Sequence, residues 1–197
     1  MRLFIAAPIS RELREALSAA LERVRTDLST MPVKWVAPEN LHLTFHFLGE
    51  TPEPAVDAIT KRLRGACANF PALDVLVAGL GCFPDFSRPK VVWVGLRDAG
   101  RLAKLQRAIH DATAEFGEQG GAARSKPDRT TFSPHLTLGR VRDTSSDQRR
   151  RLGRELQRQN LGELGWWRMD RVTLMRSELS PAGPCYRELA SVALPVS

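Results

Sequence analysis

The segment NLHLTFHFLGE at residues 40–50 is the most informative part of this sequence, because part of it occurs twice. The tetrapeptide HLTF at residues 42–45 returns far downstream as HLTL at residues 135–138. Each copy alternates polar and apolar residues, and side chains along a strand point to opposite faces in turn. Each copy therefore predicts a strand with its histidine and threonine on one face and its leucine buried on the other. Two such strands predict one site built from two parts of the chain.

The residue types in these strands favour acid–base chemistry. An imidazole titrates near pH ~6.5, so two of them facing each other can act as general base and general acid. The hydroxyls of Thr44 and Thr137 could donate hydrogen bonds to the non-bridging oxygens of a phosphate. A single histidine on a strand is more often a structural residue. The second copy in a matching context argues against that interpretation for His42 and His135.

A metal site is an alternative use of the first strand. By strict alternation His46 shares the face of His42 and Thr44, so a His42/His46 pair of metal ligands is conceivable. No nearby Cys, Asp or Glu completes the usual set of three or four ligands. We therefore expect no metal and no cofactor, with His46 packed beside or behind the site and His110 in a structural role.

Composition points to a globular protein with an anionic partner. The 197 residues are 43% hydrophobic and 26% charged, which is enough for one domain spanning residues 1–197. The net charge of +7 and the pI of about 10.0 suit RNA better than a membrane, because no segment combines a wide apolar face with a solely basic one. Nothing indicates an obligatory protein partner.

The cysteines and the N-terminus bear on location. Cys67, Cys82 and Cys185 are widely spaced and odd in number, so we expect buried free thiols in a reducing compartment. The apolar run at residues 3–9 is too short for a signal peptide or a membrane span. We expect a cytoplasmic protein.

Hydrophobic periodicity predicts an α+β fold with mainly antiparallel strands and four outer helices. The strands are expected in two sheets or half-barrels. Predicted strands are residues 2–7, 33–36, 42–49, 73–83, 90–96, 135–141, 164–180 and 186–194, and predicted helices are residues 10–28, 52–69, 99–116 and 147–159.

Basic and aromatic residues outside the motifs are candidates for RNA contacts. Phe86 and Arg88 lie in a proline-bounded connection, where they could meet a base and a phosphate, although Phe86 could equally anchor the loop. Arg124, Lys126 and Arg129 lie in the glycine-rich segment 117–133, which is either a basic RNA contact or a solvated connector. The arginines of helix 147–159 most often form a solvated face.

The motifs and their contexts resemble one known family. The segments that carry the resemblance are RLFIA (2–6), VKWVAPENLHLTFHFLGE (33–50), FSRPKVVWVGL (86–96), SPHLTLGR (133–140) and SELSPAGPCYRELASVALP (177–195). Together they are similar to the RNA 2′,3′-cyclic phosphodiesterases, formerly called 2′-5′ RNA ligases, of the two-histidine phosphoesterase superfamily.

The resemblance implies two pseudo-symmetric lobes that flank a central groove. It implies hydrolysis of RNA 2′,3′-cyclic phosphate ends to 2′-phosphomonoesters, with His42 as proton donor to the departing 3′-oxygen and His135 as the base that activates water. Thr44, Thr137 and Arg140 would hold the phosphate. Strict alternation turns Arg140 away from His135, so that role needs a bulge at Gly139.

Other functions remain open at this point. One is 2′-5′ ligation of RNA ends, and another is opening of a small cyclic nucleotide. A non-catalytic module that binds phosphorylated RNA ends belongs to a different class. The presence of both histidines favours catalysis, because binding alone could use lysine or arginine.

Overall fold

A computed structural model describes residues 1–117, 132–180 and 183–196 of the protein. Its strands are β1 (Arg2–Pro8), β2 (Val33–Trp35), β3 (His42–Glu50), β4 (Leu73–Phe83), β5 (Val91–Arg97), β6 (His135–Val141), β7 (Glu163–Met169), β8 (Arg171–Ser180) and β9 (Gly183–Ala193). Its α-helices are α1 (Arg11–Asp27), α2 (Val56–Cys67), α3 (Arg101–Thr113) and α4 (Ser146–Arg158). Short 3₁₀ turns are η1 (Pro38–Asn40), η2 (Glu53–Ala55) and η3 (Ala114–Phe116).

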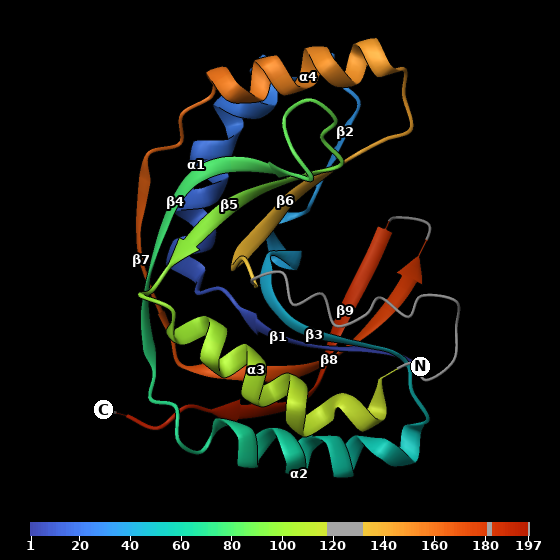
Figure 1. The fold of residues 1–197 in the computed structure, drawn as a ribbon, viewed down its shortest axis with the longest axis vertical. Helices are drawn as coiled ribbons and strands as arrows, with labels where there is room; N and C mark the ends of the chain where they lie inside the picture. Colours follow the sequence, from blue (N-terminus) through green and yellow to red (C-terminus); the bar gives the residue numbers. More distant parts are fainter. Residues whose placement is uncertain (118–131, 181–182, 197) are drawn as a thin grey trace.

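The described strands form one antiparallel sheet, which is curled into the shape of a letter C (Figure 1). Its strand order is β7-β4-β5-β6-β3-β1-β8-β9, with β2 beside β6. The expected two sheets are therefore two halves of one sheet, joined where β3 pairs with β6 at Leu43 and Leu136. Each half contributes one motif strand to this junction.

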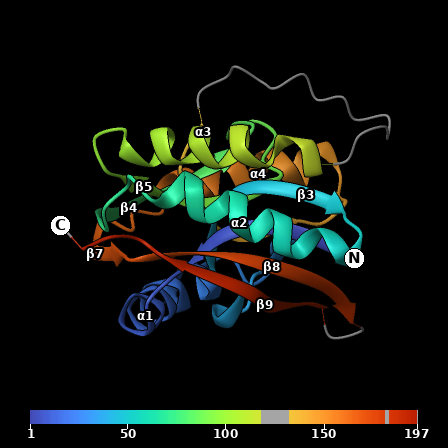
Figure 2. The same ribbon diagram turned by 90° about the horizontal axis from the view of Figure 1, so that it is seen from below.

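Amphipathic helices cover the outside of the curl. Helix α1 begins where the sequence predicted, and Ser10 caps it: Ser10 Oγ accepts a hydrogen bond from Leu13 N at 3.2 Å. It packs against β7, whereas α2 packs against β9 and α3 against β3. Seen from below, α1 and α3 lie on opposite sides of the molecule (Figure 2). The predicted α+β class and its four helices are confirmed.

One predicted strand was wrong. The segment 164–180 is two strands, β7 and β8, which are interrupted at Asp170 and lie in opposite halves of the sheet. The alternation changes phase there, because Asp170 and Arg171 are two consecutive exposed residues between the buried Met169 and Val172. The pattern therefore carries a local sign of the break but none of the change of partner. The two adjacent tryptophans of β7 point to opposite faces, since Trp167 is 2% exposed and Trp166 is 69% exposed.

The cysteine prediction holds for two of three residues. All three are free thiols, but only Cys67 and Cys82 are buried, and Cys185 is exposed. Cys185 lies on β9, which stands at the end of the strand order of the described sheet. Among the helices that the structure describes, none is long and apolar enough to cross a membrane.

Candidate active site

The two motif strands are neighbours, and their register interlocks the two motifs. Strands β3 and β6 run antiparallel with Leu43 opposite Leu136, and both leucines are buried. Antiparallel pairing then sets His42 opposite Thr137, and Thr44 opposite His135. Each imidazole therefore lies beside the hydroxyl of the other motif, in an approximately twofold arrangement.

Both imidazoles are held in the same tautomer. Nδ1 of His42 lies 2.7 Å from the carbonyl oxygen of Asn40, and Nδ1 of His135 lies 2.7 Å from that of Ser133. A carbonyl oxygen only accepts, so each Nδ1 carries the hydrogen and donates it. The free nitrogen that can take or give a proton is therefore Nε2 in both rings.

Arg140 belongs to the same face of the sheet. The register of β5 and β6 shifts so that Trp93 pairs with Thr137 but Val92 pairs with Gly139. Leu138 is thus an extra residue, and Arg140, opposite Val91, returns to the side of Thr137. A bulge that re-aims Arg140 is present as expected, one residue earlier than Gly139.

Both histidines are biased towards the neutral form. Burial lowers the pKa of His42, and the positive charge of Arg140 and the proximity of His135 lower it further, while the bond to Asn40 opposes them. Burial and then Arg140 lower the pKa of His135, against the bond to Ser133. In the free protein near neutral pH, both Nε2 atoms therefore offer lone pairs.

Aromatic rings form the walls around the two histidines. The ring of His42 lies 5.1 Å from Phe4 and 5.2 Å from Tyr186. The ring of His135 lies 4.9 Å from Phe83, edge to face, and 6.2 Å from Trp93. The Trp93 ring lies directly over Gly81, where an added Cβ would come within 2.3 Å of it, so this packing requires glycine.

Sequence reasoning missed Tyr186 as a residue of the site. It was predicted only as the first residue of the strand at residues 186–194. Its ring contacts His42, which is far away in the sequence, and the periodicity of a strand cannot predict such a contact. Burial raises the pKa of its phenol, while the charge of Arg140 counteracts this effect.

The prediction that His46 shares the strand face of His42 was wrong. The register of β1 and β3 shifts past Phe45, so His46 pairs with the fully buried Ile5 and faces α3. Its Nδ1 donates to Thr113 Oγ1 at 2.9 Å, and its ring lies 4.7 Å from that of His110. A metal pair of His42 and His46 is therefore ruled out by the geometry.

No other metal site emerges from the described residues, which hold no group of three or more His, Cys, Asp or Glu side chains able to bind an ion. Burial is the main reason why the pKa of His46 falls to about 4, with His110 adding to the effect.

The residues outside the motifs that were predicted to contact RNA differ in their exposure to solvent. Phe86 is half-buried and packs against the core, and its carbonyl oxygen touches α4 at Gly153, where an added Cβ would lie 1.6 Å from it. Phe86 is therefore an anchor of its loop. Arg88 is exposed and pairs with Asp85 at 3.4 Å. Arg124, Lys126 and Arg129 lie outside the described residues.

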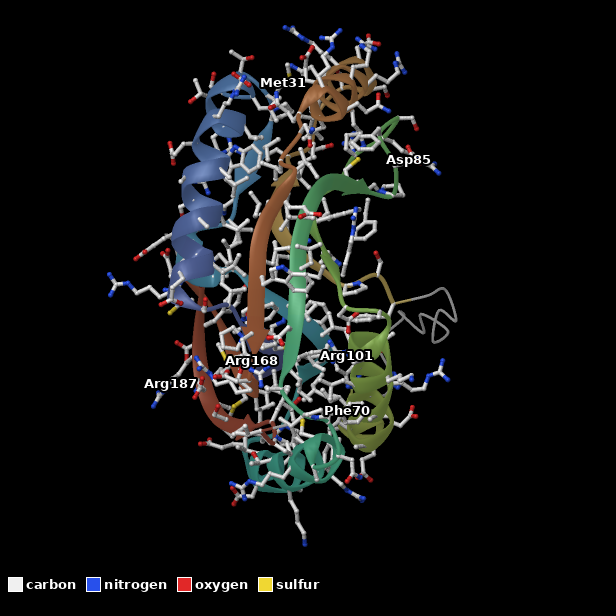
Figure 3. All side chains as sticks on the ribbon, turned by 90° about the vertical axis from the view of Figure 1, so that its left-hand side faces the viewer. Met31, Phe70, Asp85, Arg101, Arg168 and Arg187 are labelled. Carbon is white, nitrogen blue, oxygen red and sulfur yellow. The ribbon has the colours of Figure 1, made fainter. Side chains whose placement is uncertain are left out.

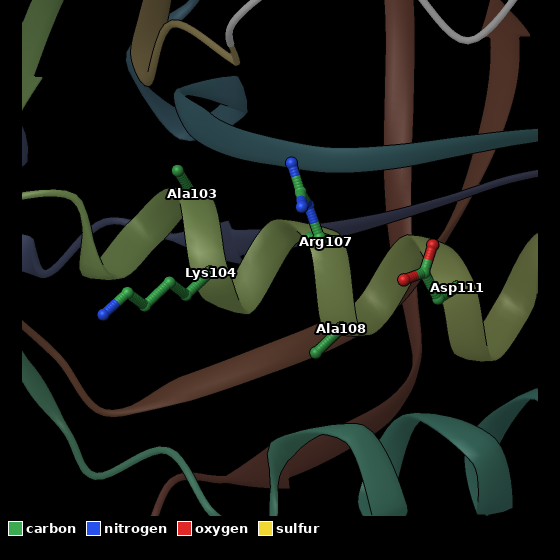
Figure 4. Close-up of a pocket in the computed structure, with 5 residues that line it drawn as sticks. All are labelled: Ala103, Lys104, Arg107, Ala108 and Asp111. Atoms are coloured by element: carbon green, nitrogen blue, oxygen red, sulfur yellow. The ribbon is translucent and has the colours of Figure 1, made fainter. Parts of the chain in front are cut away.

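Two other surface features are separate from the motif residues. Arg150 and Arg158 of α4 pair with Asp147 and Glu155 of the same helix, as expected for a solvated face. An open hollow of about 520 Å³ on α3 is lined by Ala103, Lys104, Arg107, Ala108 and Asp111 (Figure 4). It contains no motif residue, so we assign no function to it.

Comparison with known proteins identifies the family. Residues 13–181 match the family described as the 2′-5′ RNA ligase superfamily. The chain belongs to this superfamily. It is 32% identical to the RNA 2′,3′-cyclic phosphodiesterase of Methanothermobacter thermautotrophicus, over 96% of each chain. It is 34% identical to the RNA 2′,3′-cyclic phosphodiesterase of Thermus thermophilus, over 98% of this chain and 90% of that protein.

Solved structures share the superfamily fold. The crystal structure of TT0787 of Thermus thermophilus matches with a TM-score of 0.74 and 25% identity over 100% of both chains. That of E. coli LigT complexed with 3′-AMP matches with a TM-score of 0.72 and 24% identity over 98% of this chain and 97% of that one. The resemblance read from the sequence is confirmed, and the chain is a phosphoesterase-type enzyme of this superfamily.

Proposed function

We propose that this protein hydrolyses RNA 2′,3′-cyclic phosphate ends to 2′-phosphomonoesters, without a metal, by general acid and base catalysis. The observation that carries the proposal is the interlocked pair of motifs. His42 and His135 each stand beside the other motif's threonine, and both are oriented through Nδ1 so that Nε2 is free. The names of the relatives supply the substrate class.

The reaction needs one proton removed and one supplied. Water attacks phosphorus while Nε2 of His135 takes its proton, and the bond from phosphorus to the 3′-oxygen breaks as Nε2–H of protonated His42 gives that oxygen a proton. The product keeps its phosphate on the 2′-oxygen. The hydroxyls of Thr44 and Thr137 and the guanidinium of Arg140 would stabilise the negative charge on the non-bridging oxygens.

Local burial supports this division of roles. His42 is enclosed by Phe4 and Tyr186 and is more deeply buried than His135, whose contact with Ser133 is exposed. Water reaches the more open imidazole more easily, which suits His135 as the base. The low pKa of His42 disfavours the protonated donor in the free protein, and a bound phosphate anion beside it would favour that form.

The experiment uses an oligonucleotide that ends in a 2′,3′-cyclic phosphate, with a chelator present, and identifies the product isomer. Substituting either His42→Ala or His135→Ala should lower turnover by roughly 10²- to 10⁴-fold. His46→Gln is the matched control, because it removes a histidine of the same strand that faces α3, and it should leave turnover unchanged. Turnover that stops with the chelator and returns with a divalent ion would contradict the metal-free mechanism.

The same assay separates the alternatives. Joined RNA products would indicate 2′-5′ ligation, and cleavage restricted to mononucleotides would indicate a small cyclic-nucleotide phosphodiesterase. Binding without turnover would indicate a module that only holds phosphorylated ends. Our proposal includes residues 1–197 acting as one domain, with RNA ends or cyclic nucleotides as partners and a cytoplasmic location.

A further inference from the structure

The β8–β9 hairpin approaches the first motif from the other end of the chain. The side-chain amide of Asn40 donates to the carbonyl oxygen of Pro184, near the start of β9, at 3.0 Å. The backbone carbonyl oxygen of the same Asn40 accepts the hydrogen bond from His42 Nδ1. One residue thus joins the hairpin to the imidazole.

The hairpin also contacts that imidazole directly. Tyr186, two residues beyond Pro184, meets the His42 ring at 5.2 Å with an angle of 88° between the planes. The ring of Phe4, on β1, lies 5.1 Å from the ring of His42 and 5.0 Å from that of Tyr186. The three rings are in mutual contact, and Tyr186 meets both of the others in the edge-on geometry that aromatic groups prefer.

These contacts restrict different motions of His42. The hydrogen bond at Nδ1 fixes the tautomer but leaves the ring plane free to pivot about the line from Nδ1 to the oxygen. Rings packed against the imidazole oppose that pivot. The direction of Nε2 therefore depends on the rings as well as on the hydrogen bond, and proton transfer is sensitive to that direction.

We propose that Tyr186 and Asn40 are positioning residues, through which the β8–β9 hairpin fixes the direction of His42 Nε2. Among the described residues, the rings that pack beside His135 are Phe83 and Trp93 of other strands, so the hairpin contacts that the structure describes act on His42. The kinetic consequence of this inference rests on the proposed function.

The ring of Tyr186, and not its hydroxyl, makes the described contact with His42. The groups that face His42 are Tyr186 from β9, Phe4 from β1, and the charges of Arg140 and His135 from β6. Removing the ring should admit water to His42 and leave the two charges in place. Removing only the hydroxyl should leave the enclosure intact.

The test compares Tyr186→Ala and Tyr186→Phe with Arg187→Gln. Arg187 is the adjacent residue of β9, so its side chain lies on the opposite face, where it projects away from the molecule (Figure 3). The four histidines of the chain give few imidazole signals, and their pKa values can be followed by NMR without substrate. Turnover is measured with a mononucleoside 2′,3′-cyclic phosphate.

We expect Tyr186→Ala to raise the pKa of His42 towards its ordinary value and to lower kcat about 10- to 10²-fold. Tyr186→Phe and Arg187→Gln should leave the pKa of His42 in place and keep kcat within about twofold of the unmodified protein, and His135 should titrate unchanged in all three. Asn40→Ala keeps the backbone carbonyl, and it should change His42 in the same direction as Tyr186→Ala. If Tyr186→Ala fails to fold, Tyr186→Leu replaces it.

The inference is overturned if His42 titrates in Tyr186→Ala as it does in the unmodified protein, or if Tyr186→Phe loses as much kcat as Tyr186→Ala. The NMR titration needs no turnover. If the unmodified protein does not cleave the cyclic phosphate, the proposed function fails, and the titration still decides whether the hairpin positions His42.

Discussion

The buried histidine behind the site gives a quantitative prediction about stability. His46 faces α3, donates to Thr113 and has a pKa of about 4, whereas an unfolded histidine titrates near pH ~6.5. The unfolded chain therefore binds the proton more tightly than the folded one. The stability that His46 contributes as a neutral residue is complete above pH ~6.5 and is lost as the pH falls from ~6.5 towards 4.

The size of the loss follows from these two pKa values. For one group, linkage gives a contribution of about 0.2 kcal/mol against folding at pH 7 and about 2 kcal/mol at pH 5. The free energy of unfolding should therefore fall by about 2 kcal/mol over this range through His46 alone. Other groups add their own slopes, so the comparison must be made with a variant.

His46→Gln is the matched variant, because its amide can still donate to Thr113 but does not titrate. Urea unfolding of both proteins at pH 7 and pH 5 gives the difference directly. The unmodified protein should lose about 2 kcal/mol more than the variant between these pH values. Equal losses in both proteins would show that His46 is not held neutral by its surroundings, and the described packing of β3 against α3 would be refuted.

Three further predictions concern the site and its support. The charge of Arg140 lowers the pKa values of His42 and His135, so Arg140→Gln should raise both pKa values, as measured by NMR. It should also cut kcat/KM by about 10²-fold. Unchanged titrations would show that Arg140 does not lie near the two histidines. The kcat/KM of the unmodified protein should peak below pH ~6.5, because both imidazoles have lowered pKa values in the free protein, and a peak above pH ~7.5 would contradict this. Gly153→Ala should destabilise the protein by about 1–3 kcal/mol in urea unfolding, because the new Cβ meets the carbonyl oxygen of Phe86, whereas Gly65→Ala in α2, with open space at its Cβ, should be neutral or stabilising.

Local patterns predicted most of the elements because each pattern has a local cause. The cap at Ser10 and the apolar stripe of α1 are set by neighbours within one or two helical turns. The break at Asp170 leaves a local trace, the consecutive polar residues Asp170 and Arg171, but this trace does not say which strands pair on either side of it. Strands β7 and β8 differ in their partners, and partner choice depends on residues far away in the sequence.

The same distinction applies to the site. Motif repetition brought His42 and His135 together correctly, because similar strands with one buried face have few ways to meet. Alternation failed at Phe45 and Leu138, where each bulge adds a residue and exchanges the faces that follow. The first bulge turns His46 away from the motif face, and the second turns Arg140 towards it. Tyr186 was missed because only the folded hairpin brings it near.

A symmetric pair of motifs cannot by itself give two histidines different tasks. Both rings have the same tautomer, the same kind of carbonyl partner and the same threonine neighbour, so the difference must come from what surrounds them. Arg140 follows the second motif, and among the described ring contacts the hairpin residue Tyr186 packs against His42 and not against His135. The last strands of the chain therefore break the symmetry that the repeated motif creates. Under the proposed function, a general acid and a general base would then arise from one repeated strand pattern, with their roles set by residues outside the motifs.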